Sequence, residues 1–406
     1  MSAAHEYPRA ASRPVNVPPE LVIDWNILNP PRARELGPHL AWKELHKGPD
    51  IVWTEHNGGH WIVTRGEDID FLQRNHDPFS MKDVTVPHGI KPMRMLPLES
   101  DPPEHTEYRN IVTPWFTPKN IEGLAGFTRD LTANLVKQLK PKGECEFYHD
   151  FSLQVPIAIF CKLTGVPASD KEKLLEWTEW STRSPEPELR HKAHINMIDY
   201  IQTVIADRRK NPGADIMTDV VNAKVFGKPI SDADITSMMQ IILFGGLDTV
   251  ASSMSFIANF LATHPEHVKQ LIAKPEILPH AIDEMLRRHG VSGTTRTLTR
   301  DYDYKGLHFK EGDKVFVPAW LYGLDERQFD NPLDVDFSRK NVIHAGFGAG
   351  PHRCPGSYLA RVEIKIFLEE WLKEIPVFGI KPGEQVSYVP GMVNCVERVP
   401  LSWPVK

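Results

Sequence analysis

Apolar residues recur at helical spacing over most of the chain and alternate at strand spacing in only a few segments. Helical spacing predicts helices over about 102–113, 120–139, 151–163, 169–182, 187–210, 232–263, 266–273, 278–289 and 355–374. Strand-like segments cover 51–65, which is typical of a hairpin turning at Asn57-Gly58-Gly59, and also parts of 292–318 and 377–404. We therefore expect a mainly α protein with small β-sheets.

The longest predicted helix, 232–263, contains a group of residues that suit a helix poorly. Ser231 is a good N-cap for it, and Thr263-His264-Pro265 ends it. Its middle reads Phe-Gly-Gly-Leu-Asp-Thr over 244–249, where each glycine costs about 1 kcal/mol relative to alanine. An aspartate in this apolar stretch is also costly unless it is paired or hydrated. These departures predict a local bulge and a site; the alternative is a kink with a satisfied Asp–Thr pair.

The remaining segments are irregular. Residues 1–30 are rich in proline and polar residues and predict an irregular N-terminal arm, while 76–100 and 330–353 show little periodicity. A long loop within a compact domain is often a lid or a binding segment. Because no linker-like stretch divides the interior, we expect one domain over 1–406.

Composition excludes several classes of protein. The 406 residues carry a formal net charge of -6, so overall basicity does not indicate a nucleic acid or an anionic membrane as a partner. Neither a secretory leader nor an uninterrupted apolar run of about 18 residues is found. The four cysteines form no Cys-x-x-Cys pair, which favours a reducing compartment. We expect a soluble, cytoplasmic protein.

One cysteine stands in a distinctive segment. Residues 347–356 read Phe-Gly-Ala-Gly-Pro-His-Arg-Cys-Pro-Gly and lead into the last predicted helix. A thiolate near a helix N-terminus is favoured by the helix dipole and by free N–H groups, and glycines allow a flat ligand to approach the backbone. Cys354 is therefore the candidate metal ligand. The alternative is a buried cysteine beside a glycine turn.

The segment Phe347-x-x-Gly350-x-x-x-Cys354-x-Gly356 resembles the haem-binding loop of the cytochrome P-450 family, and Gly245-Gly246-x-Asp248-Thr249 resembles its oxygen-binding groove. The resemblance implies the family's single triangular-prism domain, haem b as cofactor and Cys354 as proximal iron ligand. It also implies that Thr249 stabilises the oxygen species and that Asp248 supplies protons.

Further positions match the family's cofactor site. The resemblance implies that the haem propionates meet His105, Arg109, Arg296 and His352, and that Phe347, Gly348 and Gly245 contact the haem. It also implies a structural pair of Glu284 and Arg287, spaced by three on one helix face, joined by Arg339.

The bacterial camphor-hydroxylase branch shows the greatest likeness, carried by the segments 100–105, 243–250, 323–327 and 336–339. Members of that branch use O₂ and receive electrons from a [2Fe–2S] ferredoxin and its NADH-dependent reductase. The ferredoxin docks on the cysteine side of the haem, where Arg109, Arg353 and Lys119 would offer positive charge to an acidic partner. We expect a monomer.

The substrate is expected to be small and apolar. Camphor-binding relatives hold the ketone with a tyrosine, and an ungapped count places Met93 there; Met93, Met95 and Leu96 make this region apolar and adaptable. A norisoprenoid ketone of the ionone type is therefore favoured over camphor, with His88 as a further hydrogen-bonding candidate. The remaining pocket residues implied by the resemblance are Ile241, Leu243, Phe244, Ser292, Met392 and Val393.

Three alternatives stay open. One is a peroxygenase driven by H₂O₂, against which the Asp248-Thr249 pair argues, because that branch replaces it. Another is a haem-binding sensor or carrier without turnover. The last is a helical scaffold with a structural cysteine. Pro355 is a departure of its own: it has no N–H to donate to the neighbouring sulfur, which predicts a more electron-rich thiolate.

Overall fold

The computed structural model describes residues 12–86, 93–183 and 186–405. Within them the chain is mainly helical with small sheets, as the periodicity predicts. The helices are α1 (Ala33–Leu36), α2 (Pro38–Lys43), α3 (Gly66–Arg74), α4 (Glu104–Val112), α5 (Pro118–Leu139), α6 (Gln154–Thr164), α7 (Lys171–Arg183), α8 (Pro187–Lys210), α9 (Ile216–Val221), α10 (Asp232–Thr263), α11 (Pro265–Ala273), α12 (Leu278–Arg288), α13 (Trp320–Gly323) and α14 (Ser357–Glu374).

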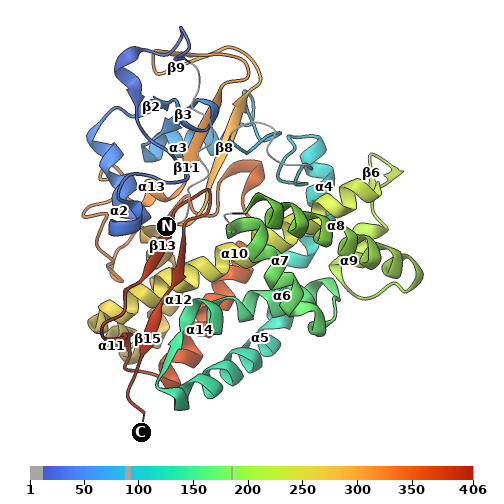
Figure 1. The fold of residues 1–406 in the computed structure, drawn as a ribbon, viewed down its shortest axis with the longest axis vertical. Coiled ribbons are helices and arrows are strands. Elements are labelled where there is room, and N and C mark those ends of the chain that lie inside the picture. Colours follow the sequence, from blue (N-terminus) through green and yellow to red (C-terminus); the bar gives the residue numbers. More distant parts are fainter. Residues whose placement is uncertain (1–11, 87–92, 184–185, 406) are drawn as a thin grey trace.

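The largest sheet lies at one end of the molecule, with α2, α3 and α13 around it, and the long helices fill the other end (Figure 1). Its strands run in the order β1-β2-β3-β11-β8-β4. Their bounds are β1 (Val22–Ile23), β2 (Ile51–Thr54), β3 (His60–Val63), β4 (Phe79–Ser80), β8 (Gly293–Leu298) and β11 (Lys314–Pro318). The predicted 51–65 hairpin is confirmed, because β2 and β3 pair antiparallel with Ile51 opposite Val63. The sheet brings β8 next to the helical part of the molecule.

The remaining strands form small sheets. β5 (Glu144–Glu146), β12 (Gly379–Ile380) and β15 (Pro400–Ser402) make a three-stranded sheet. The pairs are β6 (Lys224–Val225) with β7 (Lys228–Pro229), β9 (Tyr302–Tyr304) with β10 (Leu307–Phe309), and β13 (Ser387–Val389) with β14 (Cys395–Arg398). The N-terminal arm is less irregular than expected, since β1 joins the main sheet beside β2.

α10 crosses the helical half and is central to its core (Figure 1). Its bounds agree with the prediction, and Ser231 caps it by accepting a hydrogen bond from the backbone N–H of Asp234. The expected bulge is wrong: α10 is one continuous helix through Gly245 and Gly246. Among the described residues α10 alone is long and apolar enough to cross a membrane, but 61% of its most apolar stretch is buried inside the protein. It has the character of a core helix.

The predicted pair of Glu284 and Arg287 on α12 is confirmed. Both side chains are fully buried, with Arg287 Nε 2.7 Å from Glu284 Oε2 and Arg287 Nη2 2.9 Å from Oε1. Arg339 joins them as expected, with its Nε 3.0 Å from Glu284 Oε1. Arg287 also donates to the backbone carbonyls of Pro332 and Asp334. The cluster therefore holds the irregular segment that leads to Cys354 in contact with α12.

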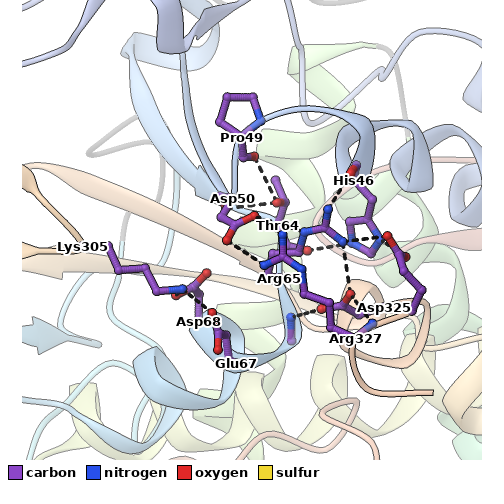
Figure 2. Close-up of polar contacts among 12 residues, drawn as sticks. His46, Pro49, Asp50, Thr64, Arg65, Glu67, Asp68, Lys305, Asp325 and Arg327 are labelled. Carbon is purple, nitrogen blue, oxygen red and sulfur yellow. Dashed lines mark hydrogen bonds and ion pairs between the residues drawn. The ribbon is translucent and has the colours of Figure 1, made fainter.

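A second ion-pair cluster joins the hairpin, α3 and the segment after α13 (Figure 2). Asp325 is fully buried; it accepts from Arg65 Nη1 at 3.1 Å and from the backbone N–H of Gly66 at 2.8 Å. Asp50 accepts from Arg65 Nε at 3.2 Å and from both terminal nitrogens of Arg327. Because a buried carboxylate is costly unless it is paired, these contacts fix the position of α3.

Candidate active site

A cavity of about 320 Å³ lies where α10, α6, β8 and the cysteine segment meet. It is open at one side and mostly apolar. Its walls include predicted residues from distant parts of the chain: Ile241, Gly245 and Thr249 from α10, Ser292 and Arg296 from the β8 strand region, His105 and Arg109 from α4, and Phe347, Gly348, His352 and Cys354 from the cysteine segment. The structure thus brings the sulfur, the predicted cationic groups and the glycine face of α10 together around one space.

The cysteine segment is a tight loop whose shape needs glycine. The Cys354 N–H donates to the carbonyl of Phe347 at 2.8 Å, which closes the loop. Gly348 and Gly350 have φ of 70° and 65°, a region that residues with a side chain rarely adopt. A Cβ at Gly350 would also lie 3.0 Å from the Cα of Arg74 on α3. The loop can therefore reach this position only with glycine at these places, and α14 begins three residues beyond the sulfur.

Opposing effects act on the sulfur of Cys354, and burial is the largest, so the pKa of the thiol is raised overall. Burial raises the pKa of the Cys354 thiol, whereas a hydrogen bond from the backbone N–H of Gly356 and the charges of Arg109, Arg361 and Arg353 lower it. None of the other cysteines lines the cavity. Burial raises the pKa of Cys161 to about 11, so that thiol is a poor ligand.

Two arginines and two histidines gather at one edge of the cavity, and no described carboxylate forms a salt bridge with any of them. Arg296 is 3% exposed, and burial lowers its pKa to about 10. The rings of His105 and His352 lie 4.2 Å apart between centroids, and neither ring nitrogen of His352 has a hydrogen-bond partner in the described part of the chain. No described carboxylate forms a salt bridge with Arg109 or Arg296. Buried donors and cations of this kind require an anionic ligand, and two propionates satisfy that requirement.

The α10 wall offers a flat, open surface beside the sulfur. A Cβ built on Gly246 would meet no other atom within 4 Å, and one on Gly245 would meet only Ile241 Cδ1, at 3.8 Å. The Thr249 hydroxyl lines the cavity and donates to the Gly245 carbonyl at 2.7 Å. A planar macrocycle therefore has room against this stretch of helix.

Asp248 and Thr249 point in different directions. Asp248 does not line the cavity; its Oδ1 accepts from the Tyr148 hydroxyl at 3.5 Å, on a π-helical turn, Tyr148–Ser152, that precedes α6. The sequence placed both residues at one site, and the structure places them on different sides of α10.

The predicted substrate residues divide into two groups. Ile241 and Ser292 line the cavity, whereas Leu243 is only 2% exposed and belongs to the helical core. Phe244 packs against the same core, and Met392 packs against the core of the main sheet.

The other predicted substrate positions lie near the cavity or away from it. Val393 pairs with Ser292 through an isolated β-bridge and so supports the wall without lining it. Met93 and Met95 are partly buried and are not among the lining residues, which here are Pro97 and Leu98. His88 lies outside the described residues.

Sequence reasoning missed the contribution of α6. Ile159, Phe160 and Leu163 line the same cavity as the cysteine segment. These residues are ordinary apolar positions in a helix that is buried almost all round, so no local pattern distinguishes a cavity wall from a core. Only the placement of α6 across α10 gives them that function.

Cys354, the two glycines of α10 and the arginines and histidines at the edge line one cavity, an arrangement that fits a haem-thiolate site. The comparisons agree. A family model described as Cytochrome P450 matches residues 169–378. The chain is 31% identical over 400 residues to the probable cytochrome P450 127A1 of Sinorhizobium fredii, covering 96% of each chain.

Solved structures give the same result over nearly the whole chain. The crystal structure of cytochrome P450 CYP101C1 has a TM-score of 0.89 at 34% identity, and that of CYP101J2 has 0.90 at 33%; each covers 97% of this chain and 100% of the other. The chain therefore belongs to the cytochrome P450 family. Haem b is the cofactor, and the protein is a monooxygenase that uses O₂, an organic substrate and a redox partner.

Proposed function

We propose that the protein hydroxylates an unactivated C–H bond of a small apolar terpenoid, with a norisoprenoid ketone of the ionone type favoured over camphor. The observation that carries this proposal is the apolar cavity that opens onto Cys354 and Thr249 together. Pro97, Leu98 and Phe160 are apolar lining residues, and they favour a substrate with little polarity.

Cys354 would hold the iron, while His105, Arg109, Arg296 and His352 would hold the propionates. The bound haem supplies the oxygen chemistry, and the protein positions the substrate and excludes water. Thr249 acts at its Oγ1: the hydroxyl donates its hydrogen bond to the Gly245 carbonyl, and rotation about the Cβ–Oγ1 bond turns the same proton into the cavity. Asp248, which accepts from Tyr148 and does not line the cavity, would take up protons and pass them on through a change of its side-chain rotamer.

The electron donor proposed is a [2Fe–2S] ferredoxin with an NADH-dependent reductase. Arg353 and Lys119 are exposed on the cysteine side and suit an acidic partner. Arg109 contributes less, because its Nη2 donates to the carbonyl of Arg353 and its side chain lines the cavity. We further propose that the chain works as a single-domain cytoplasmic monomer.

One experiment separates the candidate functions. The holoenzyme is mixed with ferredoxin, reductase, NADH and an ionone, and NADH consumption is measured together with product. Product formed at the expense of NADH supports the proposal. Product formed only with added H₂O₂ favours the peroxygenase, and haem binding without turnover favours a sensor or carrier. Lack of the red-shifted Soret band in the reduced carbon monoxide adduct would contradict thiolate ligation itself.

A further inference from the structure

Four side-chain hydroxyls line the cavity, and two of them already donate to the protein backbone. On α10, the Thr249 hydroxyl donates to the carbonyl of Gly245 at 2.7 Å, and the Ser253 hydroxyl donates to the carbonyl of Thr249 at 2.8 Å. Both residues line the cavity. In the resting conformation neither has a proton to offer to a ligand.

The other two hydroxyls stand on the β8 side of the cavity. Gly293 faces the sheet core, because a Cβ there would lie 2.5 Å from Phe316 Cζ and 3.0 Å from Trp320 Cη2. Side chains alternate along a strand, so Ser292 and Thr294 face the opposite way, and both line the cavity. They are the polar groups of this wall apart from the cationic edge.

These two hydroxyls differ in their surroundings. Thr294 Oγ1 accepts from Arg296 Nη1 at 3.0 Å, so it belongs to the cationic edge that would bind the propionates. The Ser292 hydroxyl has no hydrogen-bond partner in the described part of the chain. At about 3.3 Å per residue, Ser292 lies roughly 13 Å along the strand from Arg296. Its hydroxyl therefore stands away from the cations, beside the apolar side chain of Val291.

A polar group left without a partner in an apolar wall is costly, unless water or a ligand supplies one. The backbone holds Ser292 in place: it forms a β-bridge with Val393, and the neighbouring N–H of Gly293 donates to the carbonyl of Met392 at 2.8 Å. The hydroxyl is therefore a fixed, uncommitted donor that faces the substrate space.

We propose that Ser292 Oγ donates a hydrogen bond to the acceptor oxygen of the substrate, and that this contact selects an apolar molecule with one carbonyl over the matching hydrocarbon. The inference rests on the proposed function, which it deepens by naming the group that recognises the substrate. A ketone suits this position because it only accepts hydrogen bonds, and the serine supplies the donor. Ser292 is a specificity-determining residue, and the C–H bond that reacts lies on the part of the substrate remote from its oxygen.

The test compares two ligands on the holoenzyme by the change in the haem absorption spectrum on binding. The ligands are β-ionone and the hydrocarbon in which its carbonyl is replaced by CH₂. Ser292→Ala is expected to lower the ratio of ketone affinity to hydrocarbon affinity by roughly three- to tenfold, the effect of one neutral hydrogen bond. Ser292→Thr, which keeps the hydroxyl, should preserve most of that ratio.

Ser253→Ala is the matched control, because it also removes a cavity-wall hydroxyl, but one already committed to α10. It should leave the affinity ratio unchanged, and the carbon monoxide adduct of each variant checks that haem is bound normally. An unchanged ratio in Ser292→Ala, or an equal loss in Ser253→Ala, overturns the inference and leaves the proposed function standing. If neither ligand perturbs the wild-type spectrum, the proposed substrate class fails and the inference fails with it.

Discussion

At the scale of single residues, Thr249 is a polar side chain of α10 that lines the cavity together with Gly245 and Cys354. Its Oγ1 lies on the cavity wall but is bonded to the Gly245 carbonyl, so its position depends on a short, local hydrogen bond. Asp248, the next residue, is held by Tyr148 on the other side of the helix. Proton supply from Asp248 therefore requires side-chain motion, whereas Thr249 is already in place.

Thr249→Ala tests this assignment. Haem content and substrate binding should stay unchanged, but the fraction of NADH electrons recovered in product should fall several-fold and peroxide should rise, because the hydroxyl that manages the proton is gone. NADH, product and peroxide are measured in the same reaction. Thr249→Ser retains the hydroxyl and should remain coupled; unchanged coupling in the alanine variant would remove Thr249 from the mechanism.

Pro355 directly follows Cys354 and, as a proline, has no backbone N–H to donate to the sulfur. A hydrogen bond from the backbone N–H of Gly356 lowers the pKa of Cys354, and Pro355 has no N–H that could add another. Pro355→Leu restores an N–H and should raise the haem reduction potential, because a further donor withdraws charge from the thiolate. Spectroelectrochemical titration measures the potential. Pro355→Ala restores the same N–H without a large side chain and should shift the potential in the same direction; a fall in both would contradict the idea.

At the scale of elements, α12 is the anchor for the segment that carries Cys354. Glu284 is the single carboxylate that binds Arg287 and Arg339 within the buried cluster. Its removal leaves a buried arginine without its counter-charge, which costs far more than the loss of a surface pair.

Glu284→Ala should lower the free energy of unfolding by about 3–5 kcal/mol, the usual cost of breaking a buried pair. Urea denaturation, followed by circular dichroism, measures the change. Glu276→Ala, an exposed acidic residue just before the same helix, serves as the control and should stay within about 0.5 kcal/mol of wild type. If the free energy of unfolding of Glu284→Ala fell as little as that of the control, the cluster would not stabilise the fold.

Some features of the helices follow from the local sequence pattern, and others do not. The bounds of α10 follow from its own apolar content, the Ser231 cap and the His264-Pro265 stop, all of which act within a few residues. Its expected bulge is absent because packing on both sides of a continuous helix outweighs the low propensity of two glycines. The sequence pattern did not predict short helices such as α2 and α9, because tertiary contacts stabilise them.

At the scale of the whole molecule, folding buries histidines such as His39 and keeps their imidazole rings neutral. Burial, aided by the charge of Arg288, lowers the pKa of His39 to about 3 from its ordinary 6.5, although the carbonyl of Gly290 opposes this. The folded protein therefore keeps His39 neutral at pH values where the unfolded chain protonates it. Proton uptake favours the unfolded state, so stability falls as the pH drops below about 6.5.

Between about pH 7.5 and 5.5, each histidine of this kind should cost about 1.4 kcal/mol of unfolding free energy. His39→Gln should therefore reduce the difference in unfolding free energy between the two pH values by about that amount. This holds whatever the substitution does to stability at pH 7.5. Urea unfolding at the two pH values gives the difference. His191→Gln, at an exposed position on α8, should leave the dependence unchanged; an equal reduction there would show that burial of His39 is not the cause.

The amino-acid sequence by itself determined the reaction class. The glycines around Cys354 and the Gly-Gly-x-Asp-Thr stretch of α10 are contiguous in the chain, and their chemistry depends on spacing that any reader of the sequence can count. The helix bounds were equally accessible, because periodicity and caps are local properties.

Only the tertiary structure decided which side chains share the cavity. It turned Asp248 away from Thr249, placed Leu243 in the core, and brought Phe160 of α6 into the wall of the cavity. It also left the Ser292 hydroxyl without a partner among the described residues, in a wall that Val393 supports through a β-bridge. The reason is physical: a residue's direction on its own element is local, but the neighbour it meets depends on how elements distant in sequence pack together.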